Sequence, residues 1–148
     1  MPEVVELKRA GDLDPLYLRA LISFEFENDT RNRGDRKVGT RGYTHSISRE
    51  RDSAELFRWE WHPDIEDAPH AHLHVTSDDD FGAVGVPLRK LHLPSSRVSF
   101  EQIVTFAVND LGAEILDAEA GAQIETAHYL FERWNSWKGD RPPDDQRR

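Results

Sequence analysis

The sequence predicts an α+β domain: a mainly antiparallel sheet of about five strands, with two C-terminal helices packed on one of its faces. Two observations support this prediction. Apolar and polar residues alternate with period two in several stretches between residues 16 and 93, and apolar residues recur at helical spacing in two stretches between residues 99 and 138. The 148 residues are enough for one domain with its own core. We expect a single domain over residues 1–140 and a disordered tail over residues 141–148.

The first strand is predicted from Leu16 onward, and its buried face would carry alternate apolar residues: Leu16, Leu18, Ala20, Ile22, Phe24 and Phe26. Residues 28–42 contain three glycines and five basic residues, which predicts a loop. This loop is either a solvated, mobile hairpin connection or a basic arm that covers a phosphate-bearing ligand. A second strand is expected over residues 43–49.

The third and fourth strands form a predicted antiparallel hairpin. Residues 55–62 place Phe57, Trp59 and Trp61 toward the core, and Pro63 ends the strand. The strand at residues 69–76 follows after a short acidic connection, and its apolar face is Ala71, Leu73 and Val75. The opposite faces of the two strands should then bring polar side chains together: Arg58, Glu60 and His62 on the first strand and His70, His72 and His74 on the second.

A fifth strand is expected over residues 87–93, and Pro94 should break it. Ser99 and Gln102 have the spacing of a capping box, so a helix should begin there and end near Gly112. A second helix is predicted over residues 121–138. We expect His45 to be a surface residue, and His128 to be a surface residue or one packed in its helix rather than a ligand.

Composition excludes several functional classes. The formal net charge of -9 argues against a general nucleic-acid coat protein, but it excludes neither a nuclease with a local basic site nor a basic partner. The chain has no cysteine, so disulfides and thiolate metal sites are excluded. Its first residues lack a signal-peptide pattern, and no apolar run approaches the ~20 residues of a membrane helix. We therefore expect a cytoplasmic protein that does not act at a membrane.

The stretch His70-Ala71-His72-Leu73-His74-Val75-Thr76 is the strongest candidate for a functional site. Neighbouring histidines on one strand face lie ~7 Å apart at Cα, and the outer pair lies about twice as far apart. One metal ion would therefore be bound by two neighbouring histidines of this strand and by one side chain of the adjacent strand. The expected ligands of a divalent ion such as zinc are His72 and His74 with Glu60 or His62, which would leave a position open for water.

Chemistry without a metal is the alternative for the same face. His70, His72, His74 and His62 would then serve in acid–base or nucleophilic steps, and Arg58 would hold a phosphate. Lys90 and His92 are further candidates for phosphate or ligand binding. The seven-residue stretch resembles the histidine-triad signature of nucleotide hydrolases and transferases, in which His72 would be the nucleophile. We interpret that resemblance as convergence of spacing. His74-Val75-Thr76 also resembles half of the two-histidine phosphoesterase pattern, but Pro94 stands where its second half requires Ser or Thr.

A third resemblance covers residues 43–112. The order of elements here is similar to that of small bacterial toxins related to TumE and of similar uncharacterised families. It consists of the strand Leu56-Phe57-Arg58-Trp59-Glu60, then the strand that begins Pro69-His70-Ala71-His72, then a Ser-capped helix. The resemblance implies the toxin of a toxin–antitoxin pair, with an antitoxin protein as partner and RNA or a nucleotide as target. The activity expected from it is that of a ribonuclease or a nucleotide hydrolase. The alternative hypothesis is a non-catalytic metal- or ligand-binding module that docks a partner protein.

Overall fold

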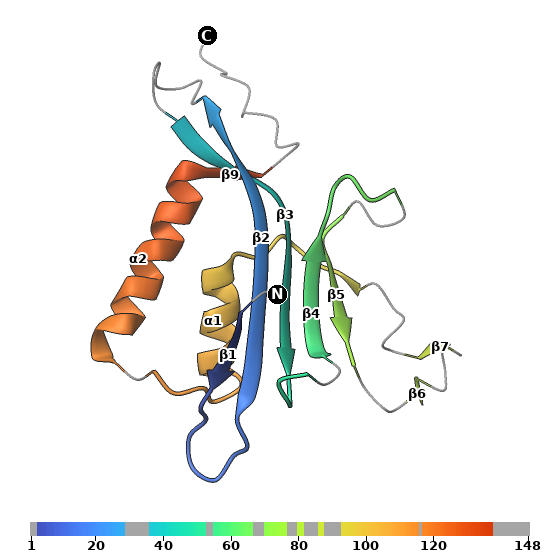
Figure 1. Ribbon diagram of the computed structural model, residues 1–148, viewed down its shortest axis with the longest axis vertical. Helices are drawn as coiled ribbons and strands as arrows, with labels where there is room; N and C mark the ends of the chain where they lie inside the picture. The colour runs from blue at the N-terminus through green and yellow to red at the C-terminus, as the bar shows by residue number, and fades with distance from the viewer. Residues whose placement is uncertain are drawn as a thin grey trace.

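The computed structural model describes residues 3–28, 36–52, 55–66, 70–76, 80–81, 86–87, 93–115 and 117–137. Within these ranges β1 to β5 and β8 form one sheet in chain order, antiparallel at every pairing, and β9 joins it by pairing in parallel with β3 (Figure 1). A separate ribbon holds β6 and β7. The elements are β1 Val4–Leu7, β2 Leu16–Asn28, β3 Arg36–Ser48, β4 Glu55–Trp61, β5 His72–Val75, β6 Asp80–Phe81, β7 Val86–Pro87, β8 Leu93–Pro94, α1 Phe100–Asn109, α2 Ala118–Trp134 and β9 Asn135–Trp137. The predicted α+β class is confirmed.

The long strands β2 and β3 pair over most of their length and correct the predicted loop. Gly42 pairs with Ser23 and Thr40 pairs with Phe24, so Arg41 is the extra residue of a β-bulge. Residues 36–42 are therefore strand rather than loop: their backbone pairs with β2, and Lys37 and Arg41 form ion pairs with Glu25 and Glu27 on that strand. Residues 29–35 lie outside the described residues.

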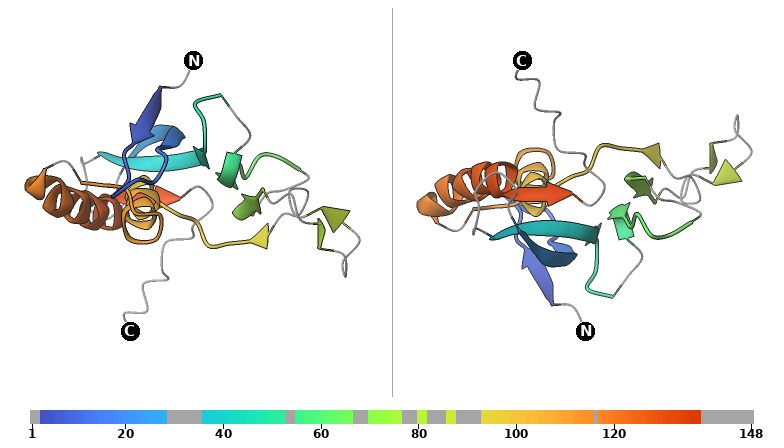
Figure 2. Two further views of the ribbon diagram at one scale, coloured as in Figure 1. Left: turned by 90° about the horizontal axis from the view of Figure 1, so that it is seen from below. Right: turned by 90° about the horizontal axis from the view of Figure 1, so that it is seen from above.

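One face of the sheet forms the core together with α1. Tyr43, Ile47 and Trp61 are fully buried on the strands, and Ile103 and Ala107 are the buried residues of α1. Trp61 is only 1% exposed, and full burial of a large apolar side chain contributes about 1.5–3 kcal/mol or more. Figures 1 and 2 show α1 between α2 and the strands, and α2 contacts α1 and β9. Among the described residues, no helix has the length and apolar composition needed to cross a membrane.

The end of the second helix differs from its predicted position. The helix stops at Trp134, and residues 135–137 continue as β9. The strand β4 pairs with β3 only as far as Tyr43, so the backbone of β3 at Val38–Thr40 is available to another strand, and β9 takes this place. Backbone pairing therefore prevails over local helical periodicity here.

The predicted fifth strand is also corrected. Its first residue belongs to β7, and Leu93–Pro94 forms β8, which pairs with β5. Pro94 does not break this strand because β8 is at the edge of the sheet, where a missing N–H donor is tolerated. Residues 88–92 lie outside the described residues. The strand β1 was not predicted, since its four residues are too few for a clear alternation.

The capping box at the start of α1 has the predicted form. The Ser99 side chain accepts a hydrogen bond from the Gln102 N–H at 3.3 Å, and the Ser99 N–H donates to Gln102 Oε1 at 2.8 Å. Gly112 follows the helix with a φ of 74°, a conformation that glycine adopts without strain.

We expect Ser99→Ala to lower the free energy of unfolding by about 1 kcal/mol, because the backbone N–H of Gln102 in the first turn of α1 loses the buried Ser99 hydroxyl as its partner. Urea unfolding followed by circular dichroism measures this change. Thr126→Ala, which removes an exposed hydroxyl within α2, is the control and should change stability by less than about 0.5 kcal/mol. Equal losses in both variants would contradict a capping role.

Candidate functional site

The hairpin of β4 and β5 aligns the polar residues in the predicted register. Arg58 lies opposite His74, and Glu60 lies opposite His72. Directly opposite residues in an antiparallel pair point to the same side of the sheet. Their apolar neighbours Trp59 and Leu73 therefore face α1, while the polar set lies on the other face.

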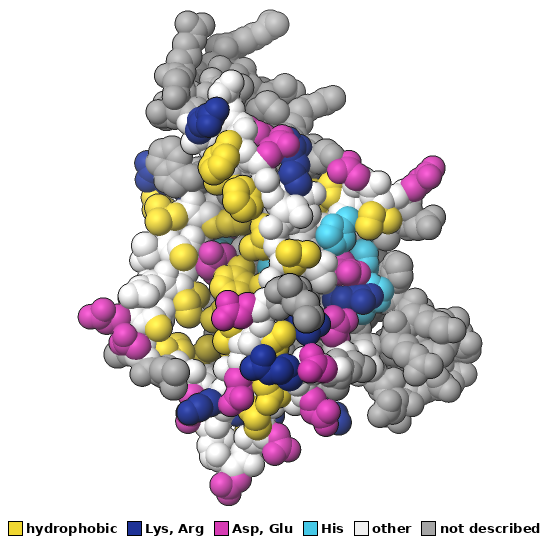
Figure 3. Space-filling view, viewed as in Figure 1, with side chains coloured by type: hydrophobic (Ala, Val, Ile, Leu, Met, Phe, Trp, Pro, Cys, Tyr) yellow, Lys and Arg dark blue, Asp and Glu magenta, His cyan; other side chains and the backbone are white. Residues whose placement is uncertain are grey.

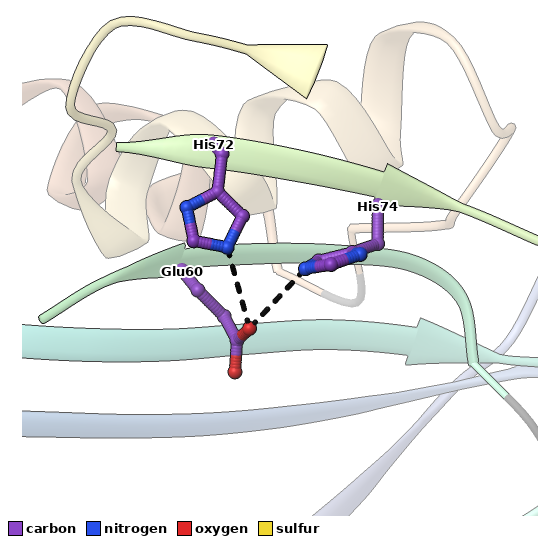
Figure 4. Close-up of side chains that lie close together, drawn as sticks. All are labelled: Glu60, His72 and His74. Carbon is purple, nitrogen blue, oxygen red and sulfur yellow. Dashed lines mark ion pairs between the residues drawn. The ribbon is translucent and has the colours of Figure 1, made fainter. Parts of the chain in front are cut away.

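Glu60 is at the centre of this polar set. Its Oε2 atom lies 3.6 Å from His72 Nε2 and 3.4 Å from His74 Nε2, as Figure 4 shows. One carboxylate oxygen from β4 thus faces two imidazoles from β5. Both histidines are buried and Glu60 is half-buried, so the three side chains are held by the surrounding sheet.

The ring of His72 has a defined orientation. Its Nδ1 lies 2.9 Å from the backbone carbonyl oxygen of His70. A carbonyl only accepts, so Nδ1–H donates, and in the neutral ring the lone pair is on Nε2. That is the atom directed at Glu60. An outer hydrogen bond that fixes the tautomer in this way is typical of metal-binding histidines.

Arg58 lies at the edge of the group and contacts the same carboxylate. Its Nε is 3.3 Å from Glu60 Oε2, and its Nη1 is 3.4 Å from Glu55 Oε2. The guanidinium therefore neutralises Glu60 and orients it, as an outer-shell partner does for a ligating carboxylate.

Glu60, His72 and His74 could hold a metal ion, since one ligand atom from each lies within 4.8 Å of the others. Two donors at about 2.1 Å from a tetrahedral zinc are roughly 3.4 Å apart, which is close to the Glu60–histidine distances. Two imidazoles and one carboxylate suit zinc or iron(II), and three protein ligands leave a position for water or substrate.

The other predicted site residues that the structure describes do not contribute a donor to this group. His62 Nε2 is 3.0 Å from Thr44 Oγ1, and the imidazole packs on Gly42, where an added Cβ would lie 2.9 Å from Nδ1. His70 is exposed, and it contributes its carbonyl oxygen to the group. Lys90 and His92 lie outside the described residues. The ring of His70 lies edge-on to that of His72 at a centroid distance of 6.3 Å, but neither His70 nor His62 is one of the three converging donors.

His45 was expected at the surface, and that expectation is wrong. Its ring is 1% exposed, stacks on Tyr43 at a centroid distance of 5.0 Å and lies near Phe100. Burial lowers the pKa of His45 from 6.5 to about 4. A signal was present in the sequence, because His45 alternates with Tyr43 and Ile47 and so shares their buried face.

His128 has a role within its helix and at the start of α1. Its Nδ1 lies 3.4 Å from Ser99 Oγ, and its Nε2 lies 3.4 Å from Glu132 one turn later. Its ring therefore contacts the first turn of α1, which accounts for a histidine at this position without a ligand.

Histidine side chains reach the surface over β4 and β5 and lie there beside acidic and basic side chains (Figure 3). Within the group, His72 and His74 are buried, and the half-buried Glu60 is the member that solvent reaches most. No protein-family model, curated protein or solved structure matches this chain.

Proposed function

We propose that Glu60, His72 and His74 bind a divalent transition metal and that the site hydrolyses a phosphate ester of RNA or of a nucleotide. The observation that carries the proposal is the convergence of the three donors at distances close to those of zinc ligands. A metal bound there would lower the pKa of a water molecule and polarise a phosphate oxygen.

The residues of the chain have separate parts in this proposal. His72 presents Nε2 because the His70 carbonyl holds its other nitrogen. Arg58 keeps the Glu60 carboxylate in place and, being partly exposed, supplies positive charge next to a substrate phosphate. Such a local charge is needed in a chain whose formal net charge is -9.

The setting we propose is the toxin of a bacterial toxin–antitoxin pair that acts in the cytoplasm and is held by an antitoxin protein. Its support is the resemblance of residues 43–112 to toxins related to TumE. Neighbouring genes provide a simple test, since a helix-turn-helix protein encoded beside this one would favour an antitoxin.

A second candidate is a metal-stabilised module without catalysis that docks a partner protein. Arg58 favours it, because the guanidinium is already paired with both Glu55 and Glu60. A cation held by two carboxylates is less available to a phosphate.

Untagged protein, stripped with a chelator and reloaded with one equivalent of zinc, manganese or iron(II), distinguishes the two candidates. We expect metal-dependent hydrolysis of bis-p-nitrophenyl phosphate and cleavage of RNA, and at least about a 100-fold loss in His72→Ala. His128→Gln, at a histidine remote from the group, is the control. Tight metal binding without turnover would favour the module, and absence of metal binding would reject both.

A further inference from the structure

The outer edge of β2 is covered over only part of its length. The short β1 pairs with Leu16–Arg19, and among the described residues no strand pairs with that edge over Ala20–Asn28. About every second residue of this nine-residue segment therefore directs its backbone N–H and C=O groups away from β3, toward the outer edge, where another strand could pair. Proteins normally cover or charge such an edge, because it is a template for pairing with a second chain.

The apolar side chains on this part of β2 are exposed, which corrects the prediction that the whole strand face is buried. Leu16 and Leu18 lie in the core, but Ile22, Phe24 and Phe26 are 40%, 56% and 64% exposed. Figure 3 shows hydrophobic side chains at the surface along the upper part of β2. A free backbone edge and an apolar face thus coincide on the same nine residues.

The acidic residues of the segment are neutralised within the chain. Glu25 pairs with Arg41, and Glu27 pairs with Arg41 at 3.1 Å and with Lys37 at 3.7 Å. These pairs lie on the face opposite the exposed phenylalanines. A second strand at this edge would therefore meet little uncompensated charge from β2.

The arrangement of residues favours a second copy of this chain as the occupant. Phe24 is the midpoint of Ala20–Asn28, so antiparallel pairing about a two-fold axis places Phe24 opposite its own copy. Ile22 then faces Phe26 of the second copy, and Ser23 faces Glu25. Leu21 faces Glu27 in the same register, so no two like charges are opposed.

We propose that this chain forms a two-fold dimer in which β2 pairs antiparallel with β2 of a second copy, centred on Phe24. The two sheets would then be continuous, and β1 of each copy covers only residues outside the paired segment. Aromatic and apolar pairs would meet on one face, each contributing about 0.2–1 kcal/mol. The dimer is independent of the proposed metal site, because β2 supplies none of its three donors.

Cysteine crosslinking tests the register, since the chain has no cysteine of its own. Directly opposite residues have Cα atoms about 4.5–5.5 Å apart, within the range of a disulfide. Under mild oxidation Phe24→Cys should convert to a covalent dimer. Phe26→Cys should not, because its own copy would be four residues away, roughly 13 Å. A mixture of Ile22→Cys and Phe26→Cys should form the heterodimer.

Light scattering on the wild-type chain supplies the second measurement. We expect a dimer at micromolar concentration, stronger in added salt because each copy carries a formal charge of -9. Phe24→Lys should be a monomer with an unchanged circular dichroism spectrum, and Leu130→Lys, at an exposed apolar residue of α2, should remain a dimer. A monomeric wild type, or equal crosslinking of Phe24→Cys and Phe26→Cys, would overturn the proposal. Both measurements are made in chelator, so failure of the metal site does not affect them.

Discussion

Replacing His72 with alanine should abolish the gain in stability that zinc gives to the metal-free protein. A ligand present at 100 times its dissociation constant raises the free energy of unfolding by about 2.7 kcal/mol when it binds only the folded state. For a domain of this size that corresponds to a rise in Tm of roughly 5–10 °C. Differential scanning calorimetry with and without zinc measures the shift.

The reason for a complete loss is that two remaining donors bind an ion much more weakly than three. Changes to outer-shell partners alone reduce metal affinity by roughly 10–100-fold, so loss of a ligand should exceed 100-fold. Glu60→Gln should behave like His72→Ala, because both remove a donor from the same group.

The matched control is His70→Ala, two residues earlier in the chain. Its side chain is exposed, and the backbone carbonyl that orients His72 is kept in the variant. The zinc shift should therefore survive. Survival of the shift in His72→Ala, or its loss in His70→Ala alone, would contradict a site made by Glu60, His72 and His74.

Acidification should destabilise the protein through His45. The unfolded chain binds a proton at this ring with a pKa near 6.5, whereas burial lowers the pKa in the folded state to about 4. Between these values the unfolded state holds more protons than the folded state, so stability falls as the pH falls. The resulting loss in the free energy of unfolding reaches about 3 kcal/mol once the pH is below 4.

The measurement compares urea unfolding of the wild type and His45→Phe between pH 7 and pH 4, in chelator. Phenylalanine retains an aromatic ring beside Tyr43 and cannot take up a proton, so its stability should fall less steeply. His70→Gln controls for removal of an imidazole from the surface. Parallel curves for the wild type and His45→Phe would show that the ring is not a source of the pH dependence.

The polar face of the hairpin could be predicted because period two assigns each side chain to a side of the sheet. The short connection between the two strands also limited their register, which brought Arg58 and Glu60 beside the histidines. The period of two residues could not predict which of the histidine side chains would lie next to the Glu60 carboxylate. That depends on where β5 begins and on the hydrogen bond that turns the ring of His72.

The direction of the His62 side chain also could not be predicted from periodicity. It shares the polar face with Glu60, yet its imidazole turns toward β3, where Thr44 offers a hydroxyl and Gly42 leaves room for the ring. Those two residues lie 18 and 20 positions away in the chain, and no local pattern links them to His62.

The sequence by itself determined the α+β class, the faces of β2, β4 and β5 and the capped start of α1, because these depend on periodicity and on neighbours within four residues. Tertiary structure alone decided which faces are covered. It buried His45 beneath Phe100 of α1 and left Phe24 and Phe26 exposed beyond the end of β1. Alternation states which residues share a face, and the docking of distant elements decides whether that face meets core, solvent or a second chain.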